Sequence, residues 1–300
     1  MARFGKVATA MVTPFGENGE LDLDVAVELA RWLVDHGNDG LVISGTTGES
    51  PTITADEQIE LIAAVAGAVD VPVVAGTGSN DTRSAVSNTE RASAAGASGI
   101  LVVTPYYNRP SQAGLLAHFK AVAAATDLPV MLYDIPVRTG RKIDTDTLLE
   151  LAHDVDNIVA LKDAAGDLAA TAMLISGAPE DFEVYSGDDS LTLPLMAVGA
   201  VGCVGVATHW TGLEHQDLMA AVEKGDLEAA REINASLLTS FAFESTPDAP
   251  NPIPTKAMMR VLGIPVGRGR APMHIEPPGL EEAARTVAAR TIVGAHLGLG

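Results

Sequence analysis

Short apolar runs alternate with longer amphipathic segments along most of this chain. The apolar runs are rich in β-branched residues, and they cover residues 7–12, 40–44, 72–75, 99–103, 129–133, 158–161, 182–185 and 202–207. Segments with helical periodicity lie between them, for example residues 23–35, 55–68, 82–95, 112–125 and 145–153. Strands that are apolar throughout are typical of a parallel sheet covered on both faces.

This repetition predicts an α/β fold, a (β/α)8 TIM barrel built from strand–helix units of roughly 20–35 residues. An open doubly wound sheet is the alternative, but no Gly-x-Gly-x-x-Gly follows the first apolar run. From residue 212 onward only helices are predicted, over 213–223, 227–243, 254–262 and 279–293, with a Pro/Gly-rich break over 263–279. We therefore predict a barrel over residues 1–225 and a C-terminal helical appendage over residues 226–300.

Composition narrows the class of protein. Nineteen basic residues against 39 acidic ones give a formal charge of −20, which argues against binding to nucleic acid or to anionic membranes. No apolar run is long enough to span a bilayer, and the N-terminus lacks the apolar stretch of a secretory signal. The single cysteine, Cys203, lies in an apolar run and is expected to be a core thiol in a reducing compartment. These features predict a cytoplasmic protein.

Lys162 is the most informative residue, because it ends an apolar run that reads as a buried strand. Burial disfavours an ammonium ion, and a neutral amine is a nucleophile that can form an imine with a carbonyl substrate. The alternative is a lysine at a strand end that reaches solvent beside Asp163. The remaining lysines lie among polar or helix-forming residues, where we expect each ammonium to reach water: Lys6, Lys120, Lys142, Lys224 and Lys256.

In a barrel of this kind the active site lies at the C-terminal ends of the strands. Tyr133 ends the run next to that of Lys162, so its phenol can carry protons for an imine, or it can be a hydrogen-bonded core tyrosine. Thr46 and Thr47 follow the second run between two glycines. Their hydroxyls suit a carboxylate or phosphate, or cap the next helix. Arg138 follows the fifth run and either grips a substrate carboxylate or is a solvated surface charge.

Neither a metal nor a cofactor is predicted. The seven histidines show no His-x-His or His-Glu-x-x-His spacing, and the chain contains neither a Walker loop nor a Gly-x-Ser-x-Gly motif. Tyr106 and Tyr107 lie in a proline-flanked loop after the fourth run, which suits a binding site or a contact between subunits.

Six short motifs, each at the end of a different predicted strand, together resemble the dihydrodipicolinate synthase family of the pyruvate-dependent class I aldolase (N-acetylneuraminate lyase) superfamily. They are Gly45-Thr46-Thr47-Gly48-Glu49, Tyr106-Tyr107-Asn108-Arg109-Pro110, Tyr133-Asp134-Ile135-Pro136, Arg138-Thr139-Gly140, Lys162-Asp163 and Ser186-Gly187-Asp188-Asp189. The resemblance implies a Schiff-base lyase of lysine (diaminopimelate) biosynthesis. Such an enzyme condenses pyruvate with L-aspartate 4-semialdehyde to give 4-hydroxy-tetrahydrodipicolinate.

The resemblance also implies a role for each site residue. Lys162 would form the pyruvate imine, and Tyr133 would donate and accept protons. Thr46 would link Tyr133 to Tyr107, which in this family reaches in from the neighbouring subunit of a tight dimer. The remaining residues are assigned to substrate binding: Thr47 and the Val204 backbone for the pyruvate carboxylate, Arg138 for the carboxylate of the second substrate, and Gly187. The family further implies a homo-oligomer, a dimer of dimers.

One departure concerns regulation. At positions where lysine-inhibited members carry residues that bind lysine, this chain has Pro51, Ala55, Gln58 and Ser84, although Asn80 and Tyr106 remain. We therefore predict weak or absent inhibition by lysine.

Two other functions compete with the synthase. A sugar-acid aldolase or N-acetylneuraminate lyase of the same superfamily would keep Lys162 and Tyr133 but not necessarily Thr47, Arg138 and the tyrosine pair. A non-catalytic barrel that acts as a binding protein would lack at least one catalytic group.

Overall fold

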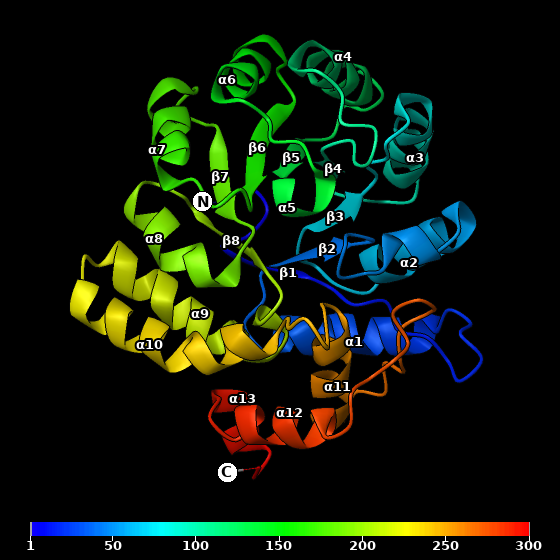
Figure 1. Ribbon diagram of the computed structural model, residues 1–300, viewed down its shortest axis with the longest axis vertical. Coiled ribbons are helices and arrows are strands. Elements are labelled where there is room, and N and C mark those ends of the chain that lie inside the picture. Colours follow the sequence, from blue (N-terminus) through cyan, green and yellow to red (C-terminus); the bar gives the residue numbers. More distant parts are fainter. Residues whose placement is uncertain (1, 300) are drawn as a thin grey trace.

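The computed structural model describes residues 2–299 and contains a closed barrel of eight parallel strands (Figure 1). Each strand pairs with the next in sequence, and β1 closes the barrel against β8, with Val7 opposite Cys203. The closure confirms the predicted barrel and excludes the open sheet. The strands are β1 (Val7–Ala10), β2 (Gly40–Ile43), β3 (Val73–Gly76), β4 (Gly99–Val103), β5 (Val130–Asp134), β6 (Ile158–Asp163), β7 (Glu183–Ser186) and β8 (Gly202–Gly205).

Helices form a ring around the strands and continue into the C-terminal part of the chain (Figure 1). The ring consists of α1 (Leu23–Asp35), α2 (Ala55–Ala66), α3 (Thr82–Ala94), α4 (Gln112–Ala123), α6 (Thr145–Asp154), α7 (Leu168–Gly177), α8 (Thr192–Ala197) and α9 (Thr208–Glu223). Short turns complete it: α5 (Pro136–Thr139) and the 3₁₀ helices η1 (Ser50–Thr52) and η2 (Asp189–Leu191). The C-terminal helices are α10 (Leu227–Phe243), α11 (Ile253–Val261), α12 (Leu280–Ala288) and α13 (Ile292–His296).

Several boundaries differ from those predicted from the sequence. The eighth strand ends at Gly205 rather than at residue 207, and α9 begins at Thr208, with a kink at Thr211. The segment predicted as one helix over 279–293 forms two, because Thr291 caps a new helix by accepting a hydrogen bond from the Gly294 amide. Helix α7, which the strand–helix repeat requires after the sixth strand, has small and apolar residues on all sides and therefore no clear polar face.

Side chains on the strands alternate between the inside of the barrel and the layer beneath the helices. The inner cluster contains Tyr133, Tyr185, Val204 and, near the N-terminal ends of the strands, Phe4. The Phe4 and Tyr185 rings meet edge to face, with their centroids 6.1 Å apart. This packing fills the barrel below the level of Lys162, so any cavity must open at the C-terminal ends of the strands.

A buried ion pair joins the C-terminal helices to the loop after β2. Lys256 on α11 is fully buried, and its ammonium lies 2.8 Å from Glu49 and 3.1 Å from the Arg268 carbonyl. The prediction that Lys256 reaches water is therefore wrong. Arg270 binds Glu57 on α2 at 2.9 Å and Glu49 through its amide. The ammonium of Lys256 and the guanidinium of Arg270 each lie within 4.3 Å of the ring centroid of Phe15, which joins this network.

Candidate active site

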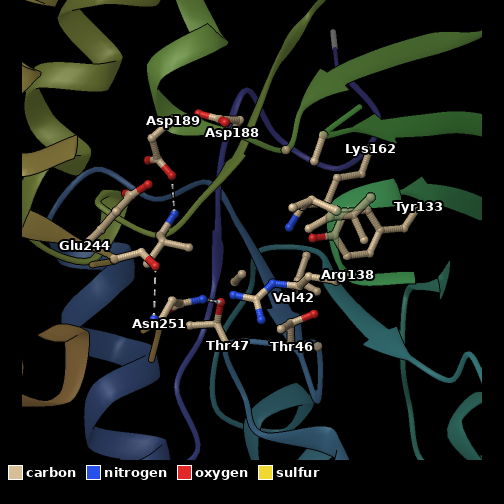
Figure 2. A pocket seen from close by; sticks show the side chains of 18 of the residues that line it. Val42, Thr46, Thr47, Tyr133, Arg138, Lys162, Asp188, Asp189, Glu244 and Asn251 are labelled. Atoms are coloured by element: carbon tan, nitrogen blue, oxygen red, sulfur yellow. Dashed lines mark hydrogen bonds between the residues drawn. The ribbon is translucent and has the colours of Figure 1, made fainter. Parts of the chain in front are cut away.

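A cavity of about 240 Å³ opens at the C-terminal ends of the strands (Figure 2). Five of the residues predicted from the sequence to belong to the site line it together with Gly187: Thr46, Thr47, Tyr133, Arg138 and Lys162. They come from the ends of β2, β5, β6 and β7 and from α5, so the barrel brings together residues that are far apart in the chain. The side chains gather around one space that is large enough for small organic acids.

Lys162 lies at the end of β6, paired in register with Tyr133 on β5 and Tyr185 on β7. Only 4% of its surface is exposed, so the alternative of a lysine that reaches solvent is wrong. Burial lowers its pKa to about 8, although the charge of Asp189 opposes this shift. Among residues 2–299 Lys162 forms no ion pair. About a tenth of Lys162 is therefore a neutral amine at pH 7, far more than for an ordinary lysine.

Tyr133 lies directly beside this amine. The Lys162 nitrogen is 4.5 Å from the centroid of the Tyr133 ring, and Figure 2 shows the amine and the phenol facing the same cavity. Burial raises the pKa of Tyr133 to about 12, while Arg138 and a hydrogen bond from Thr46 act in the opposite direction. The phenol is thus protonated at neutral pH and can donate a proton to a group formed on Lys162.

The loop after β2 is held rigidly. Thr47 is buried, and its hydroxyl accepts a 3.0 Å hydrogen bond from the side chain of Asn251. Glu49 begins η1 in the left-handed conformation, at φ 55°, and its carboxylate binds Lys256. The following helix α2 is capped by Thr54, so the alternative that Thr46 or Thr47 caps that helix is wrong. The Thr47 hydroxyl, which accepts from Asn251, keeps its proton available for a ligand carboxylate, whereas Thr46 donates its proton to Tyr133.

The other predicted site residues lie at different places. Arg138 on α5 is solvent-exposed and reaches the cavity from its rim. Tyr107 is 91% exposed and does not line the cavity within the described chain. Val204 is buried inside the barrel, and the cavity is lined instead by Val206. Gly187 makes room for the catalytic lysine candidate, because a Cβ there would lie 2.9 Å from Cγ of Lys162.

Five polar cavity residues were given no role from the sequence: Asp188 and Asp189 after β7, and Glu244, Ser245 and Asn251 after α10. The two aspartates belong to a motif that the sequence did single out. Glu244 and Asn251 lie in the segment interpreted as an appendage outside the barrel, so no local pattern placed them here. Contacts across some two hundred residues, such as Asn251 with Thr47, are visible only in the fold.

The buried position of Cys203 confirms the prediction of a core thiol, and burial raises its pKa well above the ordinary value. Among residues 2–299 no group of three His, Cys, Asp or Glu side chains is arranged to hold a metal ion. Over the same residues, no helix has the length and apolar character needed to cross a membrane.

Comparison with known proteins agrees with this geometry. The model of the Dihydrodipicolinate synthetase family matches residues 3–290. The chain belongs to this family. It is 54% identical over 275 residues to 4-hydroxy-tetrahydrodipicolinate synthase of Acidothermus cellulolyticus, an alignment that covers 91% of this chain and 87% of that protein. Membership confirms the resemblance inferred from the six motifs.

Solved structures of family members share the architecture. Dihydrodipicolinate synthase DapA-2 of Bacillus anthracis superposes with a TM-score of 0.92 at 43% identity, covering 96% of this chain and 98% of that one. The enzyme of Cyanidioschyzon merolae with lysine bound superposes with a TM-score of 0.93 at 42% identity, covering 98% and 99%. The barrel and the helices that follow it are therefore common to the family.

Proposed function

We propose that this protein is a 4-hydroxy-tetrahydrodipicolinate synthase, a Schiff-base-forming lyase that condenses pyruvate with L-aspartate 4-semialdehyde. The observation that carries the proposal is the buried amine of Lys162, whose pKa is lowered to about 8, beside the protonated phenol of Tyr133 in a cavity with Arg138 at its rim. An amine, a proton donor and an anion-binding group are the parts that an imine-forming enzyme with acidic substrates requires.

The reaction begins at Lys162. The neutral amine attacks the keto carbon of pyruvate, and loss of water gives an imine whose nitrogen carries a positive charge. Tyr133 donates a proton to the departing oxygen and then takes part in the proton transfer that converts the imine to an enamine. The nucleophilic carbon of the enamine attacks the aldehyde of the second substrate. Thr46, hydrogen-bonded to Tyr133, holds the phenol in position for these transfers.

Carboxylate binding is assigned to two sides of the cavity. Thr47, with its hydroxyl fixed by Asn251, holds the carboxylate of pyruvate together with the backbone that runs from Val204 to Val206, which reaches the cavity at Val206. Arg138 at the rim binds the carboxylate of the semialdehyde, and Gly187 leaves space beside Lys162 for the bound substrates. No cofactor takes part in this proposal.

The assembly proposed is a cytoplasmic homotetramer, a dimer of dimers. Its support is the position of Tyr107, whose side chain is 91% exposed and whose backbone has a φ of 73°. An aromatic side chain presented in this way suits insertion into a neighbouring subunit, where it would complete the chain of hydroxyls from Tyr133 through Thr46.

The deciding experiment is reduction with sodium borohydride in the presence of pyruvate, followed by peptide mass spectrometry. The expected result is one modification, at Lys162, in the wild type and none in Lys162→Ala. Labelling at another lysine, or at none, contradicts the mechanism. Coupled assays then separate the candidates, because the synthase consumes the semialdehyde, whereas a sugar-acid aldolase cleaves a keto-deoxy sugar acid or N-acetylneuraminate.

A further inference from the structure

Two carboxyl groups that the proposed reaction does not use face one another in the wall of the cavity. Asp189 begins η2 after β7 and is only 1% exposed, whereas Glu244 follows the end of α10. Figure 2 shows their carboxyl groups directed toward each other. In the described chain, Oδ1 of Asp189 and Oε2 of Glu244 are buried and receive no hydrogen bond from an N–H or O–H donor.

Such a pair is stable only if it holds a proton. Two buried carboxylates side by side repel each other and lack solvation, whereas one shared proton turns the contact into a strong hydrogen bond. Burial, and then the negative charges of Asp189 and Asp188, raise the pKa of Glu244 well above its ordinary value. Asp189 already accepts a 2.7 Å hydrogen bond from the Val206 amide and so serves as the acceptor of the pair. Glu244 is therefore the partner that carries the proton.

The pair also holds the backbone of the turn after β8. Asp189 accepts a hydrogen bond from the amide of Val206, and the amide of Ala207, the next residue, lies close enough to Glu244 to lower the pKa of its carboxyl group. This turn carries Val206, which lines the cavity, and it belongs to the backbone from Val204 to Val206 that is assigned to the carboxylate of pyruvate. Any movement of the turn therefore alters the place where that carboxylate binds.

We propose that Glu244 is a positioning residue, which in its neutral form donates a hydrogen bond to Asp189 and so fixes the turn after β8 in the geometry that binds the keto acid. The inference rests on the proposed function, because it assumes that the cavity binds a keto acid. Glu244 acts through Asp189 and the turn, and it does not touch the reacting atoms.

Several charged or titratable groups face this pair from the surrounding elements. Asp188 lies beside the pair on the same loop, and Lys162 faces the pair across the cavity from β6. The charge of Asp189 also raises the pKa of Cys203 on β8. From α9, Nε2 of His215 lies 3.8 Å from the free Asp189 oxygen. When rising pH removes the proton from Glu244, two anions confront each other and the turn loses its support. The KM for pyruvate is then expected to rise in alkaline solution.

The test compares Glu244→Gln with Glu244→Leu. Glutamine keeps a hydrogen-bond donor but cannot ionise, so E244Q is expected to restore most of the pyruvate affinity that leucine removes and to abolish the alkaline rise in KM. E244L is expected to raise the KM for pyruvate about tenfold, as for a lost hydrogen bond to a charged group, with a smaller change in kcat. Asp248→Asn removes a carboxylate from the exposed part of the same loop and serves as the matched control.

Two outcomes overturn the inference. If E244Q raises the KM for L-aspartate 4-semialdehyde as much as E244L does, Glu244 is charged and binds the ammonium group of that substrate directly. If the KM for pyruvate and its pH profile are the same in all variants, the pair has no influence on binding. If E244L fails to fold, the inference is still tested by comparing the pH dependence of the KM for pyruvate in E244Q and in the wild type. Borohydride trapping with pyruvate alone is measured in parallel, and its failure in the wild type contradicts the proposed function rather than this inference.

Discussion

We predict that replacing each of the two buried lysines by methionine has opposite effects on the stability of the folded protein. Lys162 and Lys256 are 4% and 0% exposed, and burial lowers the pKa of both to about 8. Lys162 lacks an ion-pair partner within residues 2–299, whereas Lys256 is paired with Glu49 at 2.8 Å. Replacing each by methionine, which has a similar length and no charge, separates the cost of a buried amine from the cost of breaking a buried pair.

For Lys162→Met we expect a gain in stability together with complete loss of activity. In the unfolded chain the amine binds its proton with an ordinary pKa of 10.5, but in the folded protein only with a pKa of about 8. This lowering costs the folded state about 3 kcal/mol, fully present below pH 8 and vanishing as the pH rises to 10.5. At pH 7 the variant should therefore be more stable than the wild type by up to about 3 kcal/mol.

For Lys256→Met we expect the reverse. The substitution leaves Glu49, which is 1% exposed on its side chain, with an uncompensated charge, and breaking a buried pair in this way costs about 3–5 kcal/mol. The double variant Lys256→Met, Glu49→Gln removes the stranded charge and should recover a large part of that loss. Lys162 would thus lower the stability of the folded protein, whereas Lys256 would be required for it.

The assay is urea denaturation followed by circular dichroism, at fixed protein concentration so that any contribution from assembly is constant. Midpoints are compared at pH 7 and at pH 10. The reasoning is refuted if Lys162→Met is less stable than the wild type at pH 7, or if its advantage does not shrink at pH 10. It is also refuted if Lys256→Met and the double variant have the same midpoint.

Four further predictions concern activity. The rate at which borohydride traps the imine of pyruvate with Lys162 should rise about tenfold per pH unit below pH 8 and level off above it, because the neutral fraction of Lys162 changes in the same way. A rate that does not change with pH contradicts this. Tyr133→Phe should slow condensation by about 10²–10⁴-fold while trapping at Lys162 persists, since only proton transfer is removed; lost trapping would assign Tyr133 to pyruvate binding. Asn251→Leu should raise the KM for pyruvate about tenfold, because the Thr47 hydroxyl loses the 3.0 Å hydrogen bond that Asn251 donates to it. An unchanged KM would show that this hydrogen bond is not needed to position Thr47. Lysine added to steady-state assays at millimolar concentration should not inhibit, since the Gln58 side chain is committed to the Gly76 carbonyl, and inhibition near cellular levels would contradict this.

The fold followed from the sequence because its strands are short, apolar throughout and regularly spaced. All eight predicted strands begin within one residue of their observed start, and a closed barrel is the simplest sheet that buries all of them. Lys162 could also be identified from the sequence alone, because a charged residue at the end of an apolar run conflicts with the burial of that run in any fold. The division at residue 225 stays a prediction.

The missing parts of the site depend on contacts between distant segments. Asn251 and Glu244 occupy a polar loop between two helices, and nothing in that loop specifies that it lies over the barrel. Lys256 illustrates the same difficulty, since a lysine within an amphipathic helix normally reaches water. Its burial is explained only by Glu49, a residue some two hundred positions earlier, held at a left-handed φ of 55°.

The cavity wall supplied by residues 244–251 has a consequence for the order in which the protein becomes active. During synthesis all eight strands leave the ribosome before this loop does, by about 2–9 s at ordinary elongation rates. Until the loop arrives, Lys162 faces water on that side and its proton is held more tightly, so the amine is a poor nucleophile. We therefore expect the amine of Lys162 in a nascent chain to react slowly with carbonyl metabolites until residues 244–251 have been made and have packed over the barrel.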